Sequence, residues 1–148
     1  MPLLEPPPES SSEFLRQRPD HIGAGRRGEA AALDYLVKRG YVLRDRNYRF
    51  GRGELDLVMV APTGEIVFVE VKSSRGDRAG DPLEWVHGRK QRQIQRIAQG
   101  YALVKELGDR PMRFDVVAVE WNPQTPDDVR IRHVPRAFIP EMRWYYRG

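Results

Sequence analysis

Two apolar segments joined by a short connection constrain the fold of this chain more than any other feature. Residues 54–60 and 66–72 are apolar on both of their faces, apart from four charged positions discussed below. Segments of this kind are typical of strands in the middle of a sheet, where both faces are covered. The connection at 61–65 contains Pro62 and Gly64, which indicates a turn. We therefore expect an antiparallel pair of strands at the centre of a sheet.

Hydrophobic periodicity predicts the other elements. A helix is expected over about 24–39, where Gly40 marks its end, and a longer helix over about 86–107. The apolar stripe of the first consists of Leu33, Leu36 and Val37, and that of the second of Ile94, Ile97, Tyr101 and Val104. Further strands are expected at 41–48 and 113–120, with a weaker one at 129–134.

This order of elements predicts an α/β fold with a mixed central sheet flanked by helices. Short connections at 51–53 and 61–65 make the first three strands an antiparallel meander. The helix at 86–107 is long enough to cross over the sheet, which places the fourth strand parallel to the third.

The length of 148 residues fits one domain. Residues 1–22 contain runs of proline and serine and few apolar side chains, so we expect a disordered tail. The domain is expected to extend over 23–140, with a C-terminal extension at 141–148.

Composition narrows the classes of protein. The absence of cysteine excludes disulfides, a thiolate nucleophile and cysteine-ligated zinc. No membrane span or secretory signal is evident, so we expect a cytoplasmic protein. Residues 26–148 carry 23 basic and 17 acidic side chains, an excess that modestly favours a nucleic-acid partner.

The turn at 61–65 also brings charged residues together. If Val60 pairs with Ile66, Asp56 lies opposite Glu70, and directly opposed residues have Cβ atoms about 4.5–5.5 Å apart. Lys72 shares a face with Glu70 because side chains alternate along a strand. The hairpin therefore gathers two carboxylates and an ammonium on one face.

Opposed and buried carboxylates are unfavourable unless something compensates them. One carboxyl can stay protonated, Lys72 can neutralise one, or Mg²⁺ or Mn²⁺ can bind the oxygen ligands. Glu29, on the inward stripe of the first helix, and the carbonyl of Val71 are further candidate ligands. An ordinary cluster of salt bridges remains the alternative. Glu54 alternates onto the face of Asp56, so a different register would recruit it.

Several short motifs together resemble a known family. In order, they are Gly25-Arg26-Arg27-Gly28-Glu29, Gly40-Tyr41, Arg46-Asn47-Tyr48, Gly53-Glu54-Leu55-Asp56-Leu57, Phe68-Val69-Glu70-Val71-Lys72, Arg89-Lys90-Gln91-Arg92 and Arg113-Phe114-Asp115-Val116-Val117. Asp56 with Glu70-Val71-Lys72 resembles the signature of the PD-(D/E)XK nuclease superfamily, with Leu55 in place of the proline. The whole set, over about residues 22–140, resembles the YraN family of uncharacterised, endonuclease-like bacterial proteins related to archaeal Holliday junction resolvases.

The resemblance implies a restriction-endonuclease-like core and a metal site. In that superfamily the acids matching Glu29, Asp56 and Glu70 bind the metal, and the residue matching Lys72 positions or activates the attacking water. We therefore expect a Mg²⁺- or Mn²⁺-dependent endonuclease acting on DNA, with branched or otherwise structured DNA and a homodimer suggested by the resolvases. The alternative is a non-catalytic nucleic-acid-binding or assembly module that retains the fold.

Substrate-binding residues are expected on both sides of the second helix's start. The segment after Lys72 is rich in glycine and basic side chains, and we assign Arg75 and Arg78 to contacts with the DNA backbone. Lys90 and Gln93 lie near the helix N-terminus, which favours phosphate. Lys90 is also consistent with a lysine at the edge of the apolar stripe.

Overall fold

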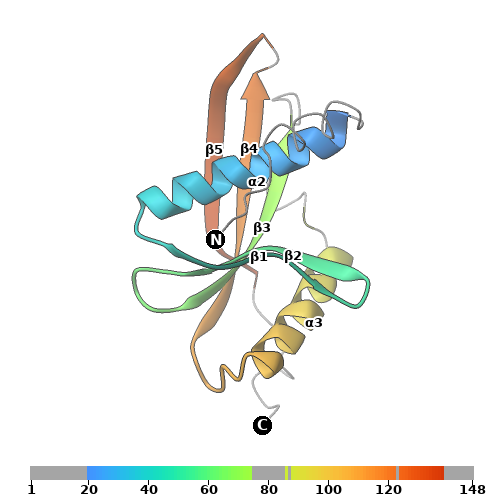
Figure 1. The fold of residues 1–148 in the computed structure, drawn as a ribbon, viewed down its shortest axis with the longest axis vertical. Helices are drawn as coiled ribbons and strands as arrows, with labels where there is room; N and C mark the ends of the chain where they lie inside the picture. Colours follow the sequence, from blue (N-terminus) through green and yellow to red (C-terminus); the bar gives the residue numbers. More distant parts are fainter. Residues whose placement is uncertain (1–19, 75–85, 87, 123, 139–148) are drawn as a thin grey trace, which may run out of the picture.

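The computed structural model describes residues 20–74, 86, 88–122 and 124–138. Figure 1 shows the elements in chain order. They are α2 (Asp20–Lys38), β1 (Val42–Phe50), β2 (Gly53–Val60), β3 (Ile66–Ser74), α3 (Gly88–Val104), β4 (Met112–Asn122) and β5 (Thr125–Phe138). Among these residues, no helix is both long and apolar enough to cross a membrane.

The five strands form one mixed sheet in the order β1-β2-β3-β4-β5. Strands β1, β2 and β3 are an antiparallel meander, β4 runs parallel to β3, and β5 returns antiparallel to β4. Helix α3 is the crossover between the two parallel strands. The predicted fold class and topology are therefore confirmed, and the weak fifth strand is longer than the predicted 129–134.

The two helices cover opposite faces of the sheet. Val67 and Val69 of β3 pack in the same cluster as Leu36 of α2. Ile66 and Phe68, which alternate with them, pack with α3. Figure 1 shows α2 crossing the strands and α3 lying against the lower half of the sheet. Central strands that are covered on both sides need apolar residues at every position, which explains the continuous apolar segments in the sequence.

The ends of both helices differ from the prediction. Helix α2 begins at Asp20, so residues 20–22, which were expected in the tail, are helical. It ends as expected before Gly40, which has a φ of 91° and donates its amide hydrogen bond to the Val37 carbonyl. Val37 and Val104 were predicted to be buried but are 50% and 60% exposed, whereas Leu36 and Tyr101 in the same last turns are fully buried, so the stripe that faces the sheet is narrower than predicted.

Helix α2 approaches β3 closely at Gly28. A Cβ atom at this position would overlap Ser73 Oγ and lie 3.1 Å from Ser73 Cβ. A side chain here would therefore require Ser73 or the helix to shift, whereas glycine lets this part of α2 rest on the end of β3. Gly25, three residues earlier in the same helix, has no atom near the corresponding position.

We expect Gly28→Ala and Gly25→Ala to change stability in opposite directions. Alanine is intrinsically the better helix former, so Gly25→Ala should raise the free energy of unfolding by about 0.5–1 kcal/mol. Gly28→Ala should lower it by about 1–3 kcal/mol, because the overlap requires Ser73 or the helix to shift. Urea denaturation of both variants measures this, and equal stabilisation by both would contradict the close contact.

Candidate metal site

The candidate site lies where strands β2 and β3 separate. Their pairing follows the predicted register from Val60↔Ile66 to Leu57↔Val69, and no pair is formed beyond it. Strand β2 then continues alongside β1 to the pair Phe50↔Gly53, whereas β3 continues alongside β4. Asp56 and Glu70, the next residues on the two strands, therefore flank an opening in the sheet.

Asp56 restores the hydrogen bonding that β3 loses at this opening. The Val71 amide donates to Asp56 Oδ2 at 2.8 Å, in place of a carbonyl on a paired strand. The N–H and C=O groups of one strand residue point toward the same edge. The Val71 carbonyl consequently faces the opening as well, where it was predicted to act as a ligand.

Glu70 lies beside Asp56 and between two lysines. Its side chain is only 7% exposed, and its Oε2 is 3.4 Å from Lys72 Nζ and 3.7 Å from Lys90 Nζ. Glu70 also lies within hydrogen-bonding reach of the Asp56 carboxyl. The structure thus brings Asp56, Glu70 and Lys72 together, as the register indicated. The second lysine comes from α3, on an element that the hairpin argument did not include.

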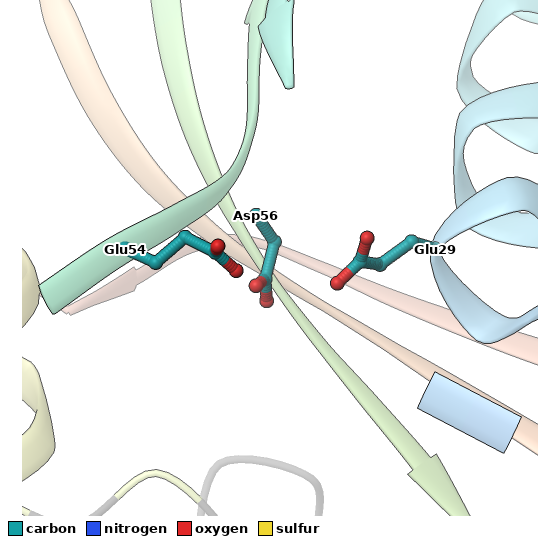
Figure 2. A group of neighbouring side chains, drawn as sticks. All are labelled: Glu29, Glu54 and Asp56. Carbon is teal, nitrogen blue, oxygen red and sulfur yellow. The ribbon is translucent and has the colours of Figure 1, made fainter. Parts of the chain in front are cut away.

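A second acid from β2 joins the cluster. Carboxylate oxygens of Glu29, Glu54 and Asp56 lie within 4.8 Å of one another, with Glu29 coming from α2. Figure 2 shows the three side chains pointing toward one another. Glu70 is not a member of this group of three. Glu54 was expected at the site only with a different register, yet it reaches the cluster with the predicted register because it shares the face of Asp56.

Asn47 of β1 connects two of these acids. Its Nδ2 donates to Glu29 Oε1 at 2.8 Å and lies 3.5 Å from Glu54 Oε1. Its φ of 52° is in the left-handed region, which asparagine tolerates better than most residues. This conformation interrupts the extended strand opposite Asp56. The pairs Arg46↔Leu57 and Tyr48↔Leu55 are formed, but Asn47 and Asp56, which lie between them, are not paired.

The carboxyl groups are held in an environment that disfavours their charges. Burial and the neighbouring Glu70 carboxylate raise the pKa of Asp56 from 3.8 to about 8. Burial is also the largest influence on Glu29, whose pKa is raised despite the hydrogen bond from Asn47, which lowers it. A divalent cation would compensate this accumulated charge, and the oxygen-only donor set fits Mg²⁺ or Mn²⁺.

Two of the four predicted substrate-binding residues, Lys90 and Gln93, lie within the described part of the chain. Lys90 lies at the site but is paired with Glu70. Gln93 lies on the same helix near Gly53 of β2. Arg75 and Arg78 are outside the described residues, as is the C-terminal extension at 141–148.

Comparisons with known proteins identify relatives along most of the chain. The model of "Uncharacterised protein family UPF0102" matches residues 28–119. A UPF0102 protein of Syntrophotalea carbinolica is 42% identical over 79% of this chain and 92% of its own length. One of Symbiobacterium thermophilum is 44% identical over 77% of this chain and 94% of its own length. A solved structure, Pyrococcus furiosus SfsA in complex with Ca²⁺, is 14% identical with a TM-score of 0.37, covering 74% of this chain and 63% of that chain.

The raised pKa of Asp56 predicts that metal affinity depends on pH. Below a pKa of about 8 the carboxyl keeps its proton, which a cation must displace. The apparent affinity for Mn²⁺ should therefore rise by about tenfold per pH unit up to about pH 8 and then level off. Calorimetric titration of the protein with Mn²⁺ at several pH values measures this.

The metal-free protein should show the opposite trend in stability. A raised carboxyl pKa means that the native state binds one more proton than the unfolded state between about pH 4 and about pH 8, so the free energy of unfolding falls as pH rises through this range. Asp56→Asn should remove this contribution.

For the metal titration, an Mn²⁺ affinity that is the same at pH 6 and pH 8, to within about twofold, would contradict the assignment of Asp56.

Proposed function

We propose that this chain, which belongs to the uncharacterised protein family UPF0102, is a metal-dependent nuclease that hydrolyses phosphodiester bonds in DNA. One observation carries the proposal: Asp56, Glu70 and Lys72 meet at the opening between two central strands, beside Glu29 and Glu54. The PD-(D/E)XK signature, which the sequence resembles, requires the first three residues to meet in this way.

The acidic cluster supplies the ligands of the proposed metal. Glu29, Glu54 and Asp56 would hold the ion, and Glu70 and the Val71 carbonyl face the same opening. A bound Mg²⁺ or Mn²⁺ lowers the pKa of coordinated water and polarises a phosphoryl oxygen, which are the two requirements of phosphodiester hydrolysis. Hard oxygen ligands without nitrogen or sulfur favour these ions over zinc.

Lys72 and Lys90 have different functions from the acids in the proposed reaction. Lys72 lies 3.4 Å from Glu70 and is 27% exposed, so its ammonium can reach a bound phosphate while it stays oriented by the carboxylate. A fixed positive charge in a partly shielded site stabilises the negative charge that develops on the phosphoryl group. Lys90 contacts the same Glu70 oxygen from α3 and keeps that carboxylate in place.

The start of α3 offers an approach for the DNA backbone. Its first turn contains Arg89 and Lys90 and no acidic side chain. Amide groups at a helix N-terminus favour anions, and the exposed Arg89 adds a cation there. Structured DNA as the preferred substrate, and a homodimer as the acting form, are proposed from the resemblance to resolvases.

The alternative is a nucleic-acid-binding module without catalysis. It is favoured by the two lysines on Glu70, since these compensate one carboxylate without any ion. Three further acids gathered at the same opening argue against it, because a module that only binds phosphate gains nothing from carboxyl groups there, whereas a metal site uses them as ligands.

Cleavage of a panel of DNA substrates tests the proposal. Labelled duplex, single strand, flap and four-way junction are incubated with the protein and Mg²⁺, Mn²⁺ or EDTA. We expect cleavage with a metal and none with EDTA. Asp56→Asn and Lys72→Ala should each reduce the rate by about a hundredfold or more, because one loses a ligand and the other a fixed charge at the reacting phosphate.

Asp34→Asn is the matched control for these variants. Asp34 is an exposed acid on α2 that pairs with Lys38, away from the cluster. The Asp34→Asn variant should cleave DNA at the wild-type rate. Undiminished cleavage by Asp56→Asn would overturn the site assignment, and DNA binding without cleavage of any substrate would establish the binding module instead.

A further inference from the structure

We infer that Arg26, Arg46 and Arg49 form a phosphate-binding surface on the β1 side of the acidic cluster, where the backbone of a bound DNA strand lies next to the bond that is cut. The inference rests on the proposed function and adds to it the surface that holds the substrate. It concerns residues of α2 and β1, whereas the approach described above uses the start of α3.

Each of the three arginines is exposed and borders an acid of the cluster. Arg26 lies one helical turn before Glu29 on α2, and Arg46 directly precedes Asn47, which donates a hydrogen bond to Glu29. The charges of both arginines oppose the rise in the pKa of Glu29. Arg49 Nε is 3.4 Å from Glu54 Oε2, and the Arg49 side chain is 82% exposed. Glu29 and Glu54 have carboxylate oxygens within 4.8 Å of each other (Figure 2). The arginines therefore lie around one small acidic centre.

The backbone explains why two arginines of one strand border the same centre. Arg46 and Arg49 are separated by an odd number of positions, and in a regular strand their side chains would point to opposite faces. The left-handed conformation of Asn47 lies between them and interrupts this alternation. Arg46 consequently approaches Glu29 while Arg49 approaches Glu54.

These arginines can leave the carboxylates of the cluster and bind phosphate groups instead. Ion pairs between exposed side chains contribute only about 0–1 kcal/mol, so leaving a carboxylate for a phosphate costs little. The guanidinium group also matches the geometry of phosphate better than an ammonium does. When a cation compensates the acids, the arginines around them become a positively charged rim. A DNA backbone fits this arrangement because its phosphates repeat along the strand.

The alternative is that the arginines only neutralise the acids and contact no partner. The two readings differ in the salt dependence of DNA binding, because each phosphate contact contributes about 0.9 to the slope of log affinity against log salt. We therefore combine Arg26→Gln, Arg46→Gln and Arg49→Gln in one variant. Fluorescence anisotropy of a labelled four-way junction and a duplex is measured over a range of salt, first with EDTA.

The measurement is repeated with Mg²⁺ in a Lys72→Ala background, which slows cleavage and leaves the acids of the cluster unchanged. We expect the slope of the triple variant to be smaller by about 2–3 than that of the protein with all three arginines. Replacing the three arginines by lysine should restore most of the slope. The control carries Lys38→Gln, Lys105→Gln and Arg110→Gln, which remove the same charge from exposed positions near the ends of α2 and α3, and its slope should change by less than about 1.

The outcomes separate this inference from the proposed function. Equal slopes for the triple variant and the control would overturn the surface, even in a protein that cleaves DNA. Absence of DNA binding by the wild type would overturn it as well. Wild-type binding whose slope depends on the three arginines, without cleavage under any metal, would support the surface and contradict the nuclease. Circular dichroism of each variant establishes that it is folded.

Discussion

The separation of β2 from β3 is the constraint on which the rest of the site depends. At Val71 the third strand has lost its neighbour on one side, and the buried edge of a sheet cannot leave an amide unpaired without a free-energy penalty. The carboxylate of Asp56 accepts this hydrogen bond, which fixes the side chain at the opening. Because the strands diverge there, Glu29 from α2 and Lys90 from α3 reach one centre, although their helices cover opposite faces.

A comparison with Asp115 shows what distinguishes this centre from a structural charge network. Asp115 is fully buried and accepts hydrogen bonds from Arg113 and from the Arg136 amide, while His133 lies 2.7 Å away. Its charge is surrounded by donors, and it holds β5 to β4. Asp56 has one backbone donor and several acidic neighbours instead, and its pKa is raised to about 8. Strongly perturbed carboxyl groups of this kind are concentrated at functional sites.

The sequence alone predicts those features that depend on neighbouring residues and on a short turn. The connection at 61–65 determines the register of β2 and β3, and the register determines that Asp56 and Glu70 meet. Features that arise from the three-dimensional arrangement were not predictable. The recruitment of Glu54 depends on the strand opening and on Asn47, whose left-handed conformation has no signal in the hydrophobic pattern. The contact between Lys90 and Glu70 requires the position of α3 over the sheet, which periodicity does not give.

Two glycine–glutamate pairs place the outer acids of the cluster by the same physical principle. Gly28 lets α2 rest on Ser73 of β3, and Glu29 follows it directly. Gly53 lets β2 pass beneath Ile97 of α3, where any Cβ atom would overlap that side chain, and Glu54 follows it directly. In each pair the missing side chain allows two elements to approach, and the next residue is thereby carried to the opening. The backbone positions of Glu29 and Glu54 therefore depend on the close contacts at the two glycines, so a substitution at either glycine should disturb the site without changing an acid.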